Sequence, residues 1–272
     1  MNRLSLNLIF QTRKAYKSRY FYKKEGYCSA CGKRSRFTYK PIINEKLAKE
    51  WQLNNRLRKA FSLRESMSCG FCASSARSRA QAAAMLEVID AKEKSLKSAI
   101  DNKRFDNLVV AEINSCGFLH EFLDSIPHLF YSEYKPKNKK ISHQDLMNLK
   151  YNNNTFDIIL TSETLEHIPE PEKALREIWR TLKPGGWHIF TVPLIIDRKT
   201  KERVSVERGK VINKFEPSYH GCGKFESDFL VCREYGSDFF NLLKKEGFHQ
   251  KIYFLNPFDR QNVNFVIASR KP

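Results

Sequence analysis

The segment of residues 156–194 constrains the fold of this chain more than any other part of it. It begins with the apolar run FDIIL, passes through the polar cluster TSETLEH, and ends, after LKPGG, in the apolar run WHIFTVPL. Between these runs, residues 169–182 have prolines where a first turn tolerates them and apolar residues at helical spacing. A strand, a helix and a strand joined by short turns predict a parallel pair of strands in an α/β fold.

The same alternation continues on both sides of that segment. Further strands are predicted at 107–112, 129–133, near 141, at 251–255 and at 263–269, and helices at 73–100, 120–125 and 237–246. Together they indicate a Rossmann-like, doubly wound α/β domain with helices on both faces of a mostly parallel sheet. The last two strands, IYFLNPF and NVNFVIAS, follow each other without a helix, which predicts an antiparallel C-terminal edge.

Four of the seven cysteines form two pairs, Cys28 with Cys31 and Cys69 with Cys72, each separated by two residues. Such a gap lets two thiolates bind one ion, so the two pairs predict a tetrahedral Cys₄ zinc site. The spacing between the pairs is longer than the roughly 15–20 residues of a usual ribbon, and residues 45–61 predict a bridging helix. Two disulfides or unpaired core thiols are the alternatives. The remaining cysteines are predicted to be buried thiols: Cys116, Cys222 and Cys232.

The basic residues are concentrated near the N-terminus. Residues 1–40 contain eleven Lys or Arg and one acidic residue, a net charge of +10. Residues 41–88 contain eight Lys or Arg and four acidic residues, a net charge of +4, so these two regions carry +14 of the whole chain's +18. We therefore expect a basic arm with a Cys₄ zinc-ribbon-like module over residues 1–88 and an α/β domain over residues 89–272. A basic module predicts an anionic partner, namely nucleic acid, an acidic glycan or a lipid surface, although a solvated basic tail has the same composition.

The chain has neither an apolar run near the ~20 residues that cross a bilayer nor an N-terminus typical of a signal peptide. These features predict a cytoplasmic protein, and therefore a reducing compartment, which favours zinc over disulfides at the cysteine pairs. The basic arm would then be available to the anionic surface of a membrane.

Three blocks resemble the class I S-adenosylmethionine-dependent methyltransferases of the type 11 group. FDIILTSETLEHIPEPEKALREIWRTLKPGGWHIFTVPL is similar to that family's FD strand, EH turn, helix and LKPGG segment, and YSEYKP with HQDL to its ribose- and adenine-contacting strands. FEPSYHG, the cysteine pairs and ARSRA resemble members with an N-terminal cysteine-knuckle module. The resemblance covers about residues 105–270 and implies S-adenosylmethionine as the cofactor and methyl transfer as the reaction.

The resemblance also implies cofactor-binding residues. Glu133 would bind the ribose hydroxyls, and Asp145, with Leu146 beside the ring, the adenine amino group. Ser162 and Glu163 would line the central region of the cofactor. A carboxylate accepts two hydroxyl hydrogen bonds well, which supports the role of Glu133. A solvent-facing acid at the end of a strand and a turn-capping acid are the ordinary alternatives for Glu133 and Asp145.

The first loop departs from the family's glycine-rich pattern. It reads Glu112-Ile113-Asn114-Ser115-Cys116-Gly117, with one glycine where two or three are expected. Glu112 resembles the family's acidic residue, and Asn114 and Gly117 would lie against the methionine end of the cofactor. Glu166 and His167 match the EH pair, for which anchoring of the turn and a direct role are both open.

His220, in FEPSYHG, is the predicted catalytic base, because an unperturbed imidazole titrates near ~6.5. A histidine packed in its loop is the alternative. In-line methyl transfer requires no metal, and four thiolates leave no open position on zinc, so the zinc is predicted to be structural.

Three functions remain open from the sequence. The first is O-methylation of a carbohydrate or another small-molecule or glycan acceptor, since cysteine-knuckle members often look like polysaccharide-cluster proteins. The second is methylation of nucleic acid, especially RNA, because RKAYKSRYFYKK interleaves aromatic and basic residues. Against it, residues 161–168 lack the Asn/Asp-Pro-Pro-aromatic signature of N6-adenine enzymes. The third is a catalytically inactive binding module, which the altered first loop favours.

Overall fold

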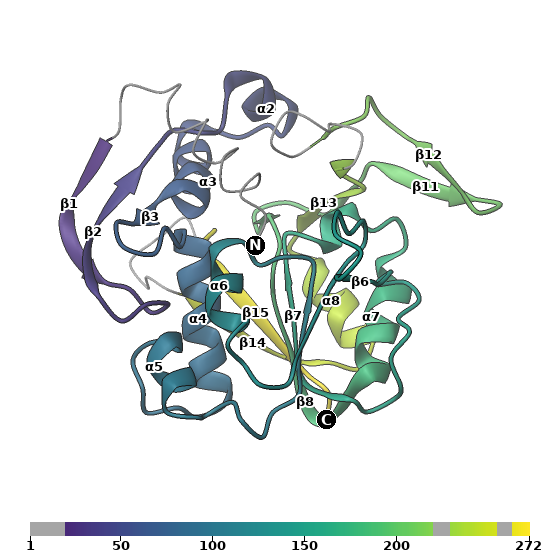
Figure 1. The fold of residues 1–272 in the computed structure, drawn as a ribbon. Coiled ribbons are helices and arrows are strands. Elements are labelled where there is room, and N and C mark those ends of the chain that lie inside the picture. The colour runs from purple at the N-terminus through teal and green to yellow at the C-terminus, as the bar shows by residue number, and fades with distance from the viewer. Residues whose placement is uncertain (1–19, 220–228, 255–262) are drawn as a thin grey trace.

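The structure is a computed structural model that describes residues 20–219, 229–254 and 263–272 (Figure 1). Within them, seven strands form a mixed sheet in the order β14-β15-β8-β7-β4-β5-β6. In sheet order they span His249–Phe254, Phe265–Arg270, Leu182–Thr191, Phe156–Ser162, Val110–Ile113, Leu129–Glu133 and Ser142–His143. Strands β6, β5, β4, β7 and β8 are parallel to their neighbours in that group. Strands β15 and β14 pair antiparallel, so the predicted α/β fold and its C-terminal edge are confirmed.

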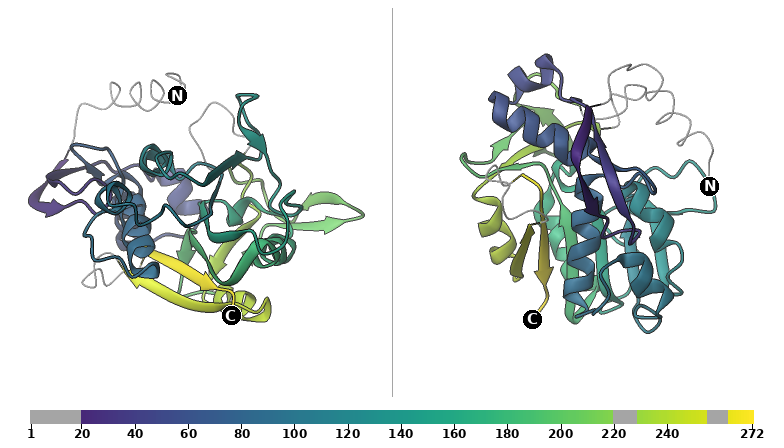
Figure 2. Two further views of the ribbon diagram at one scale, coloured as in Figure 1. Left: turned by 60° about the horizontal axis from the view of Figure 1, so that its bottom comes forward. Right: turned by 90° about the vertical axis from the view of Figure 1, so that its left-hand side faces the viewer.

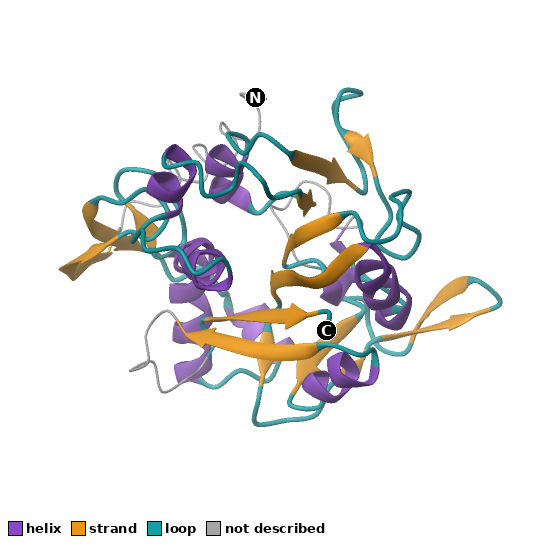
Figure 3. Ribbon diagram, turned by 90° about the horizontal axis from the view of Figure 1, so that it is seen from below, coloured by secondary structure: helices purple, strands orange, loops and turns teal. Residues whose placement is uncertain are grey.

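Helices cover both faces of this sheet (Figure 3). One face carries α4, Ala76–Val88, with α5, Leu96–Asp101, and α6, His120–Leu123. The other carries α7, Pro171–Thr181, and α8, Phe239–Lys245. Two short 3-10 helices lie after strands, η1 at Gly117–Leu119 and η2 at Leu165–His167. The arrangement is the doubly wound architecture that the alternating pattern predicted.

The side chains of the strands alternate between two hydrophobic clusters, one under each helical layer. On β7, Ile158 and Leu160 face the cluster with α4, and Ile159 faces the cluster with α7. On β15, Val266 and Ile267 divide in the same way. This period of two explains why the strands read as continuous apolar runs, since both faces are buried.

The N-terminal segment forms a small three-stranded sheet and two helices. Its elements are β1, Tyr20–Tyr27, β2, Arg34–Tyr39, α2, Glu45–Glu50, α3, Asn55–Ser66, and β3, Ser68–Cys69. Both helices have an asparagine N-cap, Asn44 and Asn54, whose side chains accept the backbone N–H three residues on. The predicted helix between the cysteine pairs is therefore two helices, separated where Gln52 adopts a positive φ of 51°.

The predicted helix over residues 73–100 is also divided into two, α4 and α5. Helix α4 begins after its N-cap Ser75 and ends at Val88, with Ile89 as its C-cap, and Asp90 has a positive φ of 50°. Ser95 then caps α5, whose first N–H, that of Leu96, donates to the Ser29 carbonyl at 2.8 Å. Helix propensity predicted the helical content, but this long-range bond to the first cysteine pair fixes the break.

Five further strands lie beyond the end of β8. They are β9, Leu194–Ile195, β10, Lys201–Glu202, β11, Val204–Glu207, β12, Lys210–Asn213, and β13, Arg233–Gly236. Strands β11 and β12 form a hairpin that projects from the body of the molecule (Figure 2). Among the described residues, the helices are too short or too polar to cross a membrane.

Candidate functional site

The loop after β4 takes a sharp turn at the carboxyl edge of the sheet. Asn114 has a φ of +59° and Gly117 a φ of +67°, both in the left-handed region. Asparagine tolerates this conformation better than most residues, so Asn114 supports a turn where the family resemblance led us to expect glycine. A Cβ added at Gly117 would meet no atom within 4 Å, so the backbone there faces open space.

Glu112 lies beneath this loop and braces it. Its carboxylate is fully buried and accepts the Cys116 backbone N–H at 2.7 Å and a bond from His120 Nδ1 at 2.5 Å. The hydrogen bond to Glu112 raises the pKa of His120 despite partial burial of the ring. Glu112 therefore has one partner in the loop and one at the start of α6, whereas Gly117 is the part of the loop next to open space.

Glu133 ends β5, directly beside the first loop. Its carboxylate accepts a hydrogen bond from the Tyr131 hydroxyl. The next residue, Tyr134, donates its backbone N–H to Asn114 Oδ1 at 2.9 Å, which ties the loop after β5 to the loop after β4. The predicted ribose-binding residue and the first loop are thus neighbours at the same edge of the sheet.

Asp145 and Leu146 follow β6, the edge strand on the same side. Asp145 accepts the Met147 backbone N–H at 2.8 Å, so its carboxylate caps a local turn. Leu146 is 2% exposed and belongs to the core cluster under α7. The hydrogen bond from Met147 is the one that the turn-capping alternative for Asp145 predicts.

Two arginines from the N-terminal segment hold the carboxyl end of β7. Arg64, in the last turn of α3, donates to both carboxylate oxygens of Glu163 at 2.9 and 2.7 Å, and to the Val192 carbonyl at 3.2 Å. Arg77, in the first turn of α4, donates to Ser162 Oγ. The side chain of Arg64 is 1% exposed and that of Glu163 is 21% exposed, so they form a bidentate ion pair with a buried guanidinium and a partly buried carboxylate.

Glu65 connects these two arginines. It accepts from Arg77 Nε at 3.0 Å and also from Arg64. The four charged side chains alternate in sign, and we call Arg64, Glu65, Arg77 and Glu163 the ionic tetrad. Sequence reasoning missed its three N-terminal members, because Arg64 and Glu163 are 99 positions apart in the chain. ARSRA, which contains Arg77, was the one signal that could have located it.

Glu163 and Glu166 have opposite pKa shifts although they are three residues apart. Burial raises the pKa of Glu163, but the charges of Arg64 and Arg77 outweigh burial and lower that pKa to about 2. Burial raises the pKa of Glu166 well above its usual range, and the negative charge of Glu163 adds to the effect. Neither carboxyl oxygen of Glu166 has a hydrogen-bond partner among the described residues. The two neighbouring carboxyl groups therefore differ in how readily they ionise.

His167 anchors η2 to the segment before β13. Its Nδ1 donates to the Leu230 carbonyl at 2.9 Å, and burial lowers its pKa. The backbone N–H of Cys232 donates to the Glu166 carbonyl at 2.8 Å. Tyr219 pairs with Leu230 in an isolated antiparallel β-bridge on the same side. His220, the predicted base, and Cys222 lie outside the described residues.

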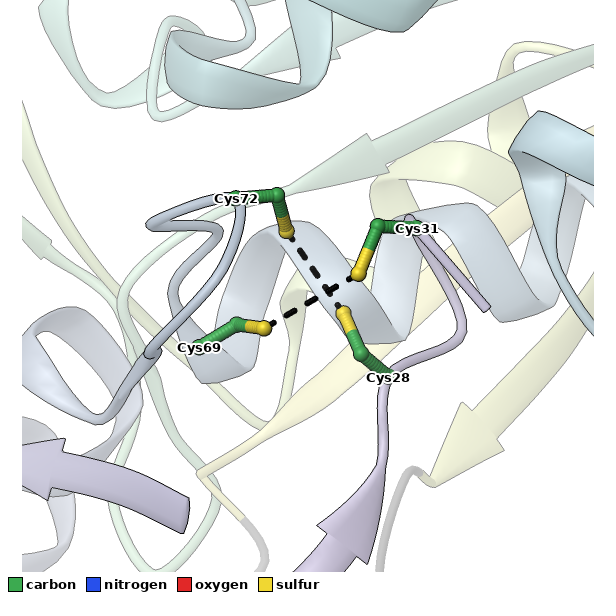
Figure 4. A group of neighbouring side chains, drawn as sticks. All are labelled: Cys28, Cys31, Cys69 and Cys72. Carbon is green, nitrogen blue, oxygen red and sulfur yellow. Dashed lines mark hydrogen bonds between the residues drawn. The ribbon is translucent and has the colours of Figure 1, made fainter. Parts of the chain in front are cut away.

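The four paired cysteines converge on one point, as Figure 4 shows. The sulfur atoms of Cys28 and Cys72 are 3.7 Å apart, those of Cys31 and Cys69 are 3.9 Å apart, and all four lie within 4.8 Å of one another. Four sulfurs at ~2.3 Å from a tetrahedral zinc ion would be about 3.8 Å apart. A disulfide needs an S–S distance of ~2.05 Å, so these sulfur–sulfur distances fit a Cys₄ zinc site and do not fit the alternative of two disulfides.

Arg79 adds electrostatic support for thiolates at this centre. Its side chain is 2% exposed, and its guanidinium lies 4.0 Å from the centroid of the Phe37 ring. Within residues 20–219, 229–254 and 263–272, no carboxylate forms an ion pair with it. A buried cation requires a counter-charge. A zinc ion with four thiolates carries a formal charge of −2, and would supply one.

Comparison with known proteins identifies relatives of the α/β region. Residues 66–190 match a family whose description is "Methyltransferase domain". The ubiquinone biosynthesis O-methyltransferase of Chromobacterium violaceum is 29% identical over 122 residues, which cover 43% of this chain and 50% of that protein. The norajmaline N-methyltransferase of Rauvolfia serpentina is 46% identical over 42 residues, 15% of this chain and 14% of that protein. This chain therefore spans half or less of the length of these two relatives.

A solved structure aligns with a longer part of the chain. The S-adenosylmethionine-dependent methyltransferase of Mesorhizobium loti aligns with 64% of this chain and 96% of its own, with a TM-score of 0.41 and 13% sequence identity.

Proposed function

We propose that this chain, whose residues 66–190 match a methyltransferase domain, is a class I S-adenosylmethionine-dependent methyltransferase and that it methylates a hydroxyl group of a small-molecule or glycan acceptor. Three strand ends at one edge of the sheet carry this proposal. Gly117 after β4 faces open space, Glu133 ends β5, and Ser162 ends β7, with β4 lying between the other two strands. Ligands of open α/β sheets bind at this edge.

The residues at the edge fit the parts of S-adenosylmethionine. Glu133 would accept hydrogen bonds from the two ribose hydroxyls, and the turn around Asp145 and Leu146 would border the adenine. Asn114 and Gly117 would let the backbone approach the methionine end. Asn114 Oδ1 is already used by the loop after β5, so its role is to shape the turn rather than to contact the ligand.

Arg77 is a further candidate for the methionine end. Its guanidinium lies against Ser162 at the end of β7, and its charge also acts on Cys116 in the first loop. A carboxylate bound there would replace or share the contacts that Arg77 makes with Glu65. Arginine binds a carboxylate with two parallel N–H groups, which suits the α-carboxylate of the cofactor.

The reaction breaks the bond between the sulfonium sulfur and its methyl carbon and forms a bond from that carbon to the acceptor oxygen. The cofactor supplies the electrophilic methyl group. The protein would hold the acceptor oxygen ~3–3.5 Å from the methyl carbon and in line with the breaking bond. The hydroxyl proton would pass to His220, which directly follows Tyr219, a residue bridged to Leu230 beside η2.

The proposed acceptor rests on two likenesses. The Chromobacterium violaceum relative is named an O-methyltransferase, which favours oxygen as the accepting atom. The resemblance to cysteine-knuckle members favours a carbohydrate. We also propose a cytoplasmic location, with the basic N-terminal arm against an anionic membrane surface.

The cysteine centre would bind a structural zinc ion through Cys28, Cys31, Cys69 and Cys72. Four thiolates complete a tetrahedron and leave no position for water or substrate, so zinc would contribute to folding rather than to chemistry.

Methylation of RNA is a second candidate, and one surface feature favours it. Phe71, on the second cysteine pair, is 62% exposed, and Lys33 Nζ lies 4.9 Å from the centroid of its ring. An exposed ring beside basic residues suits base stacking and phosphate contact. RNA binding that weakens steeply with salt and falls in Phe71→Ala would support this candidate, and binding that is unchanged by Phe71→Ala would count against it.

Calorimetric titration with S-adenosylmethionine and S-adenosylhomocysteine tests the proposed function. Each hydrogen bond to a charged group is worth about 1.5–3 kcal/mol, so Glu133→Ala should weaken binding at least about tenfold. Glu121→Ala, which removes an exposed acid from the nearby α6, is the matched control and should bind as the wild type does. Unchanged affinity in Glu133→Ala would refute the ribose assignment. Binding of both ligands without methyl transfer to glycan or RNA acceptors would favour an inactive binding module.

A further inference from the structure

The cysteine centre and the ionic tetrad are built from the same stretch of chain. Helix α3 ends at Ser66, the second cysteine pair occupies residues 69–72, and α4 begins at Ala76. The last turn of α3 carries Arg64 and Glu65, and the first turn of α4 carries Arg77. The second cysteine pair therefore lies in the segment that connects these two helix ends.

Arg79 joins the first turn of α4 to both cysteine pairs. Its carbonyl oxygen accepts the Ser29 hydroxyl at 2.6 Å, beside the first pair. Its guanidinium donates to the Met67 and Ser74 carbonyls, each at 2.8 Å, on either side of the second pair. Arg77 is two residues earlier, so on a helix it points about 200° away, toward Ser162 instead of the cysteines.

The rest of α4 is held by the sheet. Gln81, one turn after Arg77, donates to the carbonyls of Thr161 on β7 and Ile189 on β8, at 3.0 and 3.1 Å. Ala82 and Met85 are fully buried in the core cluster on that face. Packing on the sheet thus holds α4 from about residue 80 onward, whereas the turn that carries Arg77 is bonded to both cysteine segments through Arg79, and to Glu65 and Ser162 through Arg77 itself.

From this division we infer that the metal-loaded cysteine centre positions Arg77 for the cofactor, with Arg79 as the connecting residue. This inference depends on the proposed function, because it assigns Arg77 to the methionine end of S-adenosylmethionine. Metal bound by the four cysteines would fix the conformation of residues 69–72. The hydrogen bonds of Arg79 to the Met67 and Ser74 carbonyls would then fix the position of the first turn of α4. Loss of the metal would release this turn and lower the affinity for the cofactor, although the metal lies outside the cofactor site.

The test compares S-adenosylhomocysteine affinity in zinc-loaded and chelator-stripped protein by calorimetry. We expect binding to weaken about tenfold or more on stripping, the scale of one lost contact to a charged group, and to recover when zinc is added back. In Arg77→Ala the loaded protein should already bind weakly, and stripping should change its affinity little. Arg36→Ala is the matched control, because Arg36 is a 75% exposed arginine of the same module and should keep the full wild-type response.

Arg79→Gln breaks the connection without removing a cysteine. It should retain zinc, measured as metal per chain, yet bind S-adenosylhomocysteine nearly as weakly as the stripped wild type. Arg79→Lys, which keeps the charge but loses the forked donors, should lie between the two. These two variants decide the matter if the stripped wild type loses its circular dichroism signal and unfolds.

The possible failures are distinct. No binding by loaded wild-type protein would overturn the proposed function itself. Equal affinities of loaded and stripped wild-type protein would overturn the coupling and leave the proposed function standing. A stripping effect of the same size in Arg77→Ala, or full affinity in a zinc-loaded Arg79→Gln, would show that the centre does not act through these residues.

Discussion

The pKa values of Glu163 and Glu166 are shifted in opposite directions because of what surrounds each side chain. The guanidinium of Arg64 forms two hydrogen bonds with Glu163 and keeps it ionised. Glu166 is fully buried and neither of its oxygens has a hydrogen-bond partner among the described residues, so burial raises its pKa.

The raised pKa of Glu166 predicts a pH dependence of stability. Above the unfolded value of ~4.3, the folded state holds a proton that the unfolded state has released, so stability falls as pH rises until the folded pKa is passed. Glu166→Gln stays neutral and should remove this loss. Its stability relative to wild type should therefore increase from pH 5 to pH 8, by at most about 1.4 kcal/mol per pH unit.

Urea unfolding at pH 5, 6.5 and 8 measures this difference. Glu207→Gln, an exposed carboxylate on the β11–β12 hairpin, is the control and should follow the wild-type pH profile. Parallel profiles for Glu166→Gln and wild type would mean that Glu166 is ionised in the folded protein.

At the scale of elements, the sequence predicted the strands of the seven-stranded sheet and the α7 helix because their signals are local, but not the strands β1–β3 and β9–β13. Residues 156–162 alternate between two buried faces, and prolines and LKPGG bound the following helix. Breaks and partners that depend on distant residues were not visible. The division between α4 and α5 depends on the hydrogen bond from the Leu96 N–H to the Ser29 carbonyl. The role of Arg64 likewise depends on its ion pair with Glu163, which is far away along the chain. Residue types alone thus located the carboxyl edge of the sheet but not the charges supplied to it.

The turn after β4 is an element whose two functions are separable by mutation. Asn114 adopts a left-handed φ and also accepts the Tyr134 backbone N–H. Asn114→Gly removes the hydrogen bond and keeps the turn, so it should cost about 1 kcal/mol of unfolding free energy. Asn114→Ala removes the bond and adds the strain of a left-handed residue, so it should cost about 1–2 kcal/mol more.

Unfolding and cofactor titration on the same two variants check this order. Because the loop borders the open space at Gly117, both variants should also bind S-adenosylhomocysteine more weakly, and Asn114→Ala the more so. If Asn114→Ala were as stable as Asn114→Gly, the left-handed φ at residue 114 would not lower the free energy of unfolding.

In the whole molecule, the N-terminal segment is packed into the α/β region. Cys28 and Cys69 belong to the same core cluster as Ile158 of β7 and Val266 of β15. On the opposite side of the segment, Arg198 donates to the Trp51 carbonyl at 2.7 Å. The predicted boundary at residue 88 would cut directly after α4, which covers one face of the sheet. We therefore expect the two parts to unfold as one cooperative unit, since each buries apolar surface of the other.

Loss of one metal ligand should consequently destabilise the sheet as well as the cysteine centre. Cys69→Ser removes a ligand that is 3% exposed, and should lower zinc content and reduce the melting temperature of the whole chain by about 5–10 °C in a single transition. Cys232→Ser is the matched control, because Cys232 is also 3% exposed but lies outside the centre, beside the His167 carbonyl. It should keep zinc and melt close to wild type. Calorimetry with metal analysis distinguishes the alternatives, since a sheet that melts unchanged while a separate early transition appears in Cys69→Ser would mean that the cysteine module folds as an independent domain.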